Sequence, residues 1–183
     1  AAAQMPRLAI VCCTGAGFEN VALGALRNRG VVVTHGPGLN DATVADHALA
    51  LMLAVSRDIP RLDRDARAGV FEANRVARPT ISGTRLGIIG LGNVGRRIAE
   101  RAAAFEMSIG YLTRTPRNDV AWTHHPDAVA LAAASDYLVA ACPGGPATRH
   151  LVNAAVLDAL GPEGFFVNVA RGSVADTAAL IAA

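Results

Sequence analysis

The sequence has few aromatic residues, no cluster of basic residues and no long apolar run, and each absence excludes a class of protein. Aromatic residues make up 4% of the 183 positions and the formal net charge is only +2, so nucleic acid is not expected as a partner. No apolar run approaches the roughly 18 residues of a membrane-spanning helix, and the first residues lack the layout of a signal peptide. The sequence therefore predicts a soluble cytoplasmic protein with no membrane partner.

Cysteine is also scarce, and its three positions fit neither disulfides nor a metal site. The sequence has an odd number of cysteines, which does not make a disulfide set, and their spacing does not fit metal ligands: Cys12, Cys13 and Cys142. The first two lie in an apolar run. We expect reduced thiols in a core or at a pocket wall. Internal repeats and low-complexity linkers are absent as well. With 52% hydrophobic residues, the chain can bury a core, and its length corresponds to one domain plus part of another.

Strand and helix patterns alternate along the whole chain. Apolar runs predict strands at 8–13, 31–34, 85–89, 107–112, 136–141 and 165–170, and helical spacing predicts helices at 20–29, from Asp41 or Thr43 to about Ile59, and at 93–105, 127–134, 153–160 and 178–183. Pro60 is expected to mark a break after the long helix, and 61–77 mixes charged residues with scattered apolar ones. This alternation predicts a doubly wound α/β fold with a parallel sheet.

A glycine-rich turn follows the strand at 85–89 directly. Gly90 allows a tight turn, Gly92 leaves room for a pyrophosphate against the backbone, and Gly95 lets the next helix pack close to the strand. Asn93 and Val94 open that helix, whose free N–H groups and positive dipole end would face phosphates. With a strand before it and a helix and second strand after it, the motif predicts a dinucleotide site. The alternative is a glycine turn without a ligand.

The end of the second strand bears on which dinucleotide is bound. An Asp or Glu about 20 residues into such a unit commonly binds the adenosine ribose, but here Thr113, Arg114 and Thr115 occupy this place. A carboxylate would repel a 2′-phosphate, whereas a guanidinium can bind it through two charge-assisted hydrogen bonds. We therefore expect NADP(H) in preference to NAD(H), with NAD(H) still possible. The alternative is that Arg114 is a solvated loop cation.

Two further loops are candidates for binding a small anion. Arg171 follows the strand at 165–170, at the strand end where open α/β sheets bind ligands, although it is also compatible with an ordinary surface position. Gly15, Ala16 and Gly17 follow the first strand, and successive N–H groups of such small residues can form a concave anion site or an ordinary turn.

None of the five histidines is assigned to catalysis. His35 could line a cleft beside a glycine-proline turn, and His124 and His125, next to Pro126, are expected in a solvated loop. Adjacent histidines without a carboxylate or thiolate cluster are poor metal ligands, so no metal is predicted.

Several motifs in order resemble the D-isomer-specific 2-hydroxyacid dehydrogenase family over essentially the whole chain. The resemblance is carried by a glycine-rich substrate loop, the start of an interdomain helix, the cofactor turn and the segment bearing the family's catalytic arginine: Thr14–Val21, Thr43–Ala48, Gly90–Gly95 and Val167–Gly172. Within the family, Pro143–Gly145 and Thr113–Thr115 look most like NADPH-dependent glyoxylate, hydroxypyruvate or 2-ketogluconate reductases.

This resemblance implies a Rossmann-type NAD(P)-binding domain at 41–183 and a remnant of a flavodoxin-like substrate domain at 1–40. It implies reduction of a small 2-oxo acid to the D-2-hydroxy acid, with Arg171 gripping and polarising the substrate and Ala16 and Gly17 binding its carboxylate. The cofactor contacts it implies are Gly90, Gly92, Asn93, Val94, Gly95, Thr113, Arg114, Thr115, Cys142, Thr148, Val169, Ala170 and Arg171. The family's general-acid histidine and its partner glutamate are expected beyond Ala183, so we expect the sequence to be a fragment.

Two alternative functions stay open on the sequence alone. The same scaffold could sense NAD(P)(H) and bind protein partners, as corepressors of similar fold do. It could also bind another adenosine ligand such as S-adenosylmethionine.

The helix from Thr43 is apolar over much of its circumference, which predicts a homodimer through this region or a helix packed between two domains.

Overall fold

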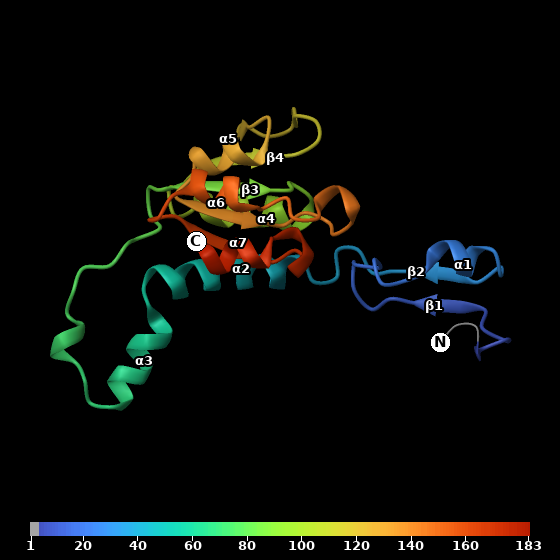
Figure 1. The fold of residues 1–183 in the computed structure, drawn as a ribbon, viewed down its shortest axis with the longest axis horizontal. Helices are drawn as coiled ribbons and strands as arrows, with labels where there is room; N and C mark the ends of the chain where they lie inside the picture. Colours follow the sequence, from blue (N-terminus) through green and yellow to red (C-terminus); the bar gives the residue numbers. More distant parts are fainter. Residues whose placement is uncertain (1–3) are drawn as a thin grey trace. The chain divides into compact units, whose positions relative to one another are not determined.

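The computed structural model describes residues 4–183, which divide into two compact units, one ending at Asp41 and one formed by Ala42–Ala183. Each unit is described by itself below (Figure 1). Whether the first is the remnant of a substrate domain stays a prediction.

The first unit is a small βαβ element. Strands β1 (Ile10–Cys12) and β2 (Val32–Thr34) pair in parallel, and helix α1 (Leu23–Arg27) connects them. The helix is shorter than predicted, because the segment before it forms turns, with the Val21 N–H donating to the Phe18 carbonyl at 2.9 Å. Cys12 is exposed, so the expectation that both adjacent cysteines lie in a core or pocket wall is wrong for this one. The reason is that only one face of this strand pair is even partly covered.

The second unit contains a five-stranded parallel sheet in the order β5-β4-β3-β6-β7. Its strands are β3 (Arg85–Ile89), β4 (Ser108–Leu112), β5 (Thr123–His124), β6 (Tyr137–Ala140) and β7 (Phe165–Asn168). The connecting helices are α4 (Asn93–Ala103), α5 (Ala128–Ala133) and α6 (Ala154–Leu160). The further α-helices are α2 (Asp41–Ser56), α3 (Ile59–Arg67) and α7 (Thr177–Ala182), and short 3-10 helices lie at Glu72–Asn74, Pro146–Thr148 and Gly172–Val174. This confirms the α/β class and the parallel sheet.

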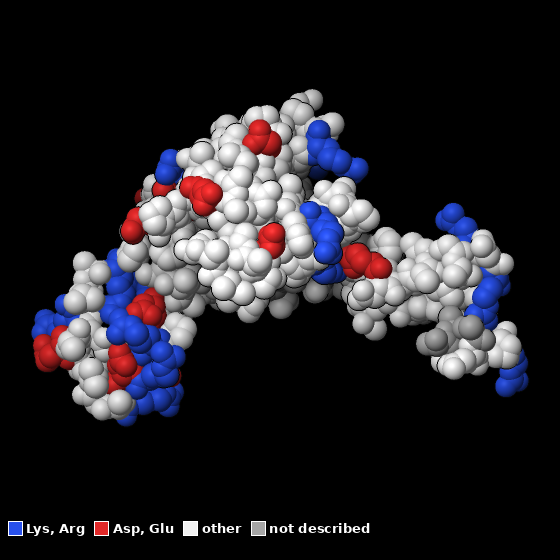
Figure 2. Space-filling model, in the orientation of Figure 1, with Lys and Arg blue, Asp and Glu red and all other residues white. Residues whose placement is uncertain are grey.

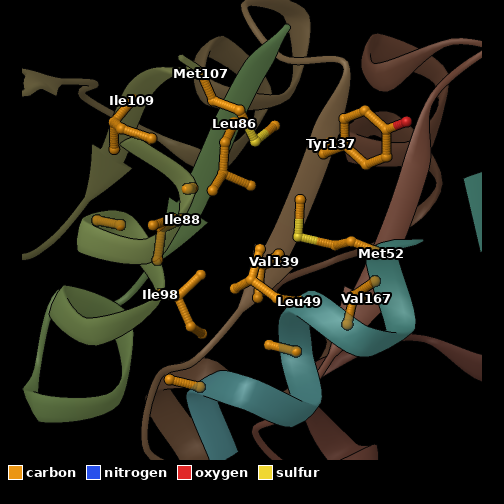
Figure 3. Close-up of a cluster of buried hydrophobic side chains, with 14 of the residues drawn as sticks. Leu49, Met52, Leu86, Ile88, Ile98, Met107, Ile109, Tyr137, Val139 and Val167 are labelled. Atoms are coloured by element: carbon orange, nitrogen blue, oxygen red, sulfur yellow. The ribbon is translucent and has the colours of Figure 1, made fainter. Parts of the chain in front are cut away.

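Helices cover both faces of this sheet because alternate strand residues point to opposite sides. On one face, residues of α2 and α4 pack against Leu86 and Ile88 of β3, and Figure 3 shows Leu49 and Met52 of α2 directed toward this core. On the other face, α5 and α6 pack around Ile89. The central strand β3 is thus covered on both sides, as its unbroken apolar run predicts.

The chain between α2 and β3 departs from the sequence-based expectation. α2 ends at Ser56, Asp58 takes a left-handed φ of 55°, and Pro60 lies in the first turn of α3 rather than ending a helix. Proline is compatible with this position because first-turn N–H groups have no helical partner. Interspersed acidic and basic side chains cover this segment (Figure 2), and they include the ion pair of Arg61 with Asp65. Among residues 4–183, no helix is both long and apolar enough to span a membrane.

Candidate functional site

The carboxyl ends of β3 and β6 lie side by side at the point where the strand order reverses. Chain connections leave these two strands in opposite directions, so a crevice opens between them in folds of this type. Gly90 follows β3 with φ of 97°, and a Cβ there would lie 2.7 Å from the Cα of Cys142, which follows β6. Burial raises the pKa of the Cys142 thiol, so this side chain is a neutral wall residue.

Two other glycines of the turn differ in their surroundings. A Cβ on Gly95 would collide with the carbonyl oxygen of Gly90, so α4 can approach β3 only with glycine at this position. A Cβ on Gly92 would meet nothing within 4 Å. The protein therefore has no packing reason for glycine at position 92, and the open space above its backbone fits an external group such as a pyrophosphate.

Helix α4 begins at this open position without a capping side chain. α5, α6 and α7 each begin after an Asp or Asn whose side chain accepts an N–H of the first turn: Asp127, Asn153 and Asp176. At α4 the N-cap is Gly92, and no side chain provides such a bond. The first-turn N–H groups of Asn93, Val94 and Gly95 are thus available to an anion.

The loop after β4 carries Thr113, Arg114 and Thr115, and it is held by its own hydrogen bonds. The Thr113 hydroxyl donates to the Thr115 carbonyl at 2.7 Å, and Nε2 of His124 lies 3.1 Å from the Thr113 carbonyl oxygen. The Arg114 side chain is exposed, and no hydrogen bond or ion pair engages it within residues 4–183. A fixed backbone with an uncommitted guanidinium is a suitable anion contact.

The placement of His124 corrects the sequence-based expectation of a solvated loop. It belongs to β5, an edge strand of the sheet, and is only partly exposed. Its ring packs edge-to-face on the Tyr111 ring, with centroids 5.2 Å apart. A two-residue strand has too little apolar alternation to be recognised in the sequence.

The loops after β6 and β7 complete this edge of the sheet. The Thr148 hydroxyl lies 2.8 Å from the Pro143 carbonyl oxygen, so this side chain closes its own loop. After β7, the Asn168 side chain accepts from the Ala170 N–H at 3.0 Å and donates to the Arg171 carbonyl at 2.9 Å. Arg171 is exposed, and its Nη1 donates to the Ala170 carbonyl at 2.8 Å. The sequence reasoning did not single out Asn168, although it lies within the arginine motif.

The loop of the first unit is fixed by contacts from the residues that follow β2. The Gly36 N–H donates to the Gly15 carbonyl at 3.0 Å, and Nδ1 of His35 lies 3.0 Å from the Ala16 carbonyl oxygen. The Phe18 ring packs edge-to-face on the His35 ring. Ala16 and Gly17 therefore lie in an ordered turn, and their role in binding a substrate carboxylate stays a prediction.

Within the second unit, the predicted cofactor residues thus follow the carboxyl ends of four strands. The glycine turn follows β3, Thr113–Thr115 follow β4, Cys142 and Thr148 follow β6, and Val169–Arg171 follow β7. A parallel sheet with a switch point, a glycine turn and an uncapped helix defines a Rossmann-type dinucleotide-binding domain.

Comparison with known proteins gives the family. Residues 49–183 match the model of the D-isomer specific 2-hydroxyacid dehydrogenase, NAD binding domain. The chain belongs to this family, whose members are NAD(P)-dependent oxidoreductases.

Several proteins that the chain is similar to are reductases. The chain is 41% identical over 181 residues to glyoxylate/hydroxypyruvate reductase A HPR2 of Arabidopsis thaliana, covering 98% of this chain and 58% of the relative. It is 38% identical to a 2-ketogluconate reductase of Gluconobacter oxydans (strain 621H), covering 98% and 58%. A crystal structure of an NADPH-dependent glyoxylate/hydroxypyruvate reductase of Sinorhizobium meliloti, in complex with NADP and malonate, superposes with a TM-score of 0.91 at 41% identity, covering 97% and 56%. The chain thus spans somewhat more than half the length of these relatives.

Proposed function

We propose that this chain is the cofactor-binding part of an NADP(H)-dependent oxidoreductase that reduces small 2-oxo acids, such as glyoxylate or hydroxypyruvate, to D-2-hydroxy acids. The observation that carries the cofactor choice is Arg114, an exposed guanidinium at the end of β4, where NAD-binding members of this fold carry a carboxylate. The NADPH-dependent relative from Sinorhizobium meliloti supports the same choice.

The residues of the crevice fit a dinucleotide. The pyrophosphate would lie over Gly92 against the N–H groups that open α4, and the adenosine end would extend toward Thr113–Thr115. When bound, the nicotinamide supplies the hydride for the reduction. Cys142 and Thr148 would line the crevice from the β6 side, and Val169 and Ala170 from the β7 side.

Arg171 is proposed as the catalytic residue in this chain. Its guanidinium can bind the carboxylate and keto oxygen of a 2-oxo acid and stabilise the negative charge that builds on that oxygen. The backbone that carries it is fixed by both hydrogen bonds of the Asn168 side chain. We further propose that backbone N–H groups at Ala16 and Gly17 bind the substrate carboxylate. A homodimer is the proposed assembly.

The cofactor choice is tested by Arg114→Asp. Loss of a charge-assisted contact and gain of a repelling carboxylate should weaken NADPH binding by about 10- to 100-fold, whereas NADH binding should stay equal or improve. Titration of the variant and the unchanged chain with both nucleotides, followed by cofactor fluorescence, measures this. Unchanged discrimination between NADPH and NADH would refute the assignment.

The catalytic role is tested by Arg171→Gln in the whole reductase. Loss of a preorganised cation at the developing charge should lower kcat/KM for glyoxylate by roughly 100- to 1000-fold. The affinity for NADPH should change far less, so steady-state kinetics are compared with nucleotide titration. Arg171→Lys should recover only part of the activity, since an ammonium lacks the planar fork. Equal activity in all three proteins would remove Arg171 from the mechanism.

A further inference from the structure

One carboxylate joins two arginines beside the loop that carries Arg114. Asp119 accepts two parallel hydrogen bonds from Arg117, Nε to Oδ1 and Nη2 to Oδ2, both at 2.9 Å. Its Oδ2 also accepts from Nη2 of Arg96, which lies in the first turn of α4. Asp119 therefore ties the start of α4 to the segment after β4, the two segments that flank the adenosine ribose in folds of this type.

The backbone at Arg117 is anchored to the sheet by a buried tyrosine. Tyr111 of β4 is 1% exposed, and its hydroxyl accepts from the Arg117 N–H at 2.8 Å and lies 3.4 Å from the Arg117 carbonyl oxygen. Because β4 is an interior strand of the sheet, this contact sets the position of the segment relative to the glycine turn. The Arg117 side chain thus leaves the backbone at a fixed point.

The cluster of Arg96, Arg117 and Asp119 carries a net positive charge. The Asp119 carboxylate stays ionised at neutral pH, because the hydrogen bonds from Arg117, together with that from Arg96, hold its pKa well below its usual range. Two guanidiniums around one carboxylate leave one excess positive charge, and Arg114 in the same loop adds a second. A phosphate monoester carries about −1.5 to −2 at pH 7, so its charge matches this excess.

Donor groups are also left over for such an anion. A guanidinium has five N–H donors, and Asp119 engages one nitrogen of Arg96 and two of Arg117. Two nitrogens that share one carboxylate oxygen lie close enough to contact neighbouring oxygens of one phosphate. Without the carboxylate between them, the two cations would repel each other and separate.

We propose that Arg96 and Arg117, held together by Asp119, bind the 2′-phosphate of NADP(H) alongside Arg114. Asp119 is a positioning residue: its own charge opposes the phosphate, and it favours binding only by keeping two guanidiniums in place. The cofactor preference then depends on three cations from two segments rather than on one. This inference rests on the proposed NADP(H) preference.

The test uses the adenosine end of the cofactor alone. The 183-residue chain is titrated by calorimetry with adenosine 2′,5′-bisphosphate and with adenosine 5′-monophosphate. Arg96→Gln and Arg117→Gln should each weaken bisphosphate binding by about tenfold, the size expected for one charge-assisted contact, and change monophosphate binding by less than about twofold. Arg97→Gln is the matched control, since it removes the same charge from the next position of α4 and should leave the preference for the bisphosphate unchanged.

The direction in which Asp119→Asn changes bisphosphate affinity shows whether Asp119 positions the two arginines or only repels the phosphate. In the unchanged chain it should weaken bisphosphate binding by roughly threefold to tenfold, because the two guanidiniums are released. In the Arg96→Gln/Arg117→Gln background it should have no weakening effect, because only the repelling charge remains to be removed. Stronger binding after Asp119→Asn in the unchanged chain would show that the carboxylate competes with the phosphate, and would overturn the positioning role.

The possible outcomes distinguish this inference from the proposed function. A chain that binds neither nucleotide, or both equally well, contradicts the NADP(H) preference itself. If the preference is present and Arg114→Asp abolishes it, but Arg96→Gln and Arg117→Gln behave like Arg97→Gln, only the present inference is wrong. Thermal unfolding confirms that each variant is folded, and Arg96→Lys, which keeps the charge, should recover part of the lost affinity.

Discussion

At the scale of single residues, we expect substitutions at two glycines of the cofactor turn to have different effects, one on ligand binding and the other on folding stability. Gly92→Ala adds a methyl group where no atom lies within 4 Å, at φ of −77°, which alanine adopts readily. We expect unchanged stability and roughly tenfold or greater loss of NADPH affinity, because the methyl group occupies the space left for the pyrophosphate. Gly95→Ala would collide with the Gly90 carbonyl and should destabilise the fold by about 1–3 kcal/mol, despite the higher helix propensity of alanine.

Thermal unfolding and NADPH titration of the two variants check this. Loss of stability in Gly92→Ala with unchanged cofactor affinity would contradict the assignment of the open space to a ligand.

The sequence predicts where a single residue lies in the fold if a motif fixes the spacing, whereas the role of that residue stays a prediction. The distance from the glycine turn to Arg114 is set by one helix and one strand, so its place at the end of β4 could be foreseen. The contact of Asp119 with Arg96 could not, because it joins residues 23 positions apart across a helix and a loop. The tyrosine that anchors Arg117 was missed for a similar reason: its hydroxyl role depends on how the loop folds back over β4.

At the scale of elements, an ion pair ties the amino ends of two central strands together, at the edge opposite the cofactor crevice. Asp136, just before β6, accepts hydrogen bonds from the Arg85 N–H at 2.8 Å and from its guanidinium Nη2 at 2.6 Å. These bonds lower the pKa of the Asp136 carboxyl, against the opposing effect of burial. The carboxylate therefore favours the folded state.

Asp136→Asn should reduce the free energy of unfolding by about 1 kcal/mol at neutral pH, a modest value because 37% of the Asp136 side chain is exposed. A lowered native pKa means that this stabilisation is present above the unfolded value of about 3.9 and is lost as the pH falls through the native pKa. Urea unfolding at about pH 7 and about pH 3 measures the difference between the two proteins, which should shrink at the lower pH.

Asp63→Asn is the control, since its pair with Arg67 is an exposed contact within α3, and should change stability little at either pH. If Asp136→Asn changes the free energy of unfolding equally at both pH values, the electrostatic explanation is refuted.

The sequence predicts the elements of this sheet well and their boundaries less well. Continuous apolar runs placed β3, β4, β6 and β7 to within about two residues, because buried parallel strands leave a strong signal. The stop assigned to Pro60 was wrong, since the true break is the left-handed Asp58, and proline is compatible with the first turn of the following helix. Such a choice depends on the backbone of the preceding residue, which composition does not fix.

At the scale of the whole molecule, the second unit has large apolar side chains that are exposed on its surface and are not part of its core. On α2, Ala48 and Met52 are buried, whereas Leu51 and Val55 are 37% and 51% exposed. The segment that follows adds exposed Ile59, Phe71 and Val76. Side chains of this kind, on a long helix and the segment after it, are typical of a protein–protein contact. They support the proposed homodimer, which is one of the two arrangements that the helical pattern from Thr43 predicts.

The last prediction tests this assembly. Leu51→Arg/Val55→Arg places two charges on the exposed side of α2 without touching the buried Ala48 and Met52. If the face is covered by a second copy, desolvating unpaired charges there costs several kcal/mol, and sedimentation should show conversion of dimer to monomer. Val129→Arg, at a 43% exposed position of α5 on the other face of the sheet, is the control and should leave the dimer intact. If the wild-type protein is a monomer, or if the Leu51→Arg/Val55→Arg variant remains a dimer, this apolar surface of α2 is not the dimer interface.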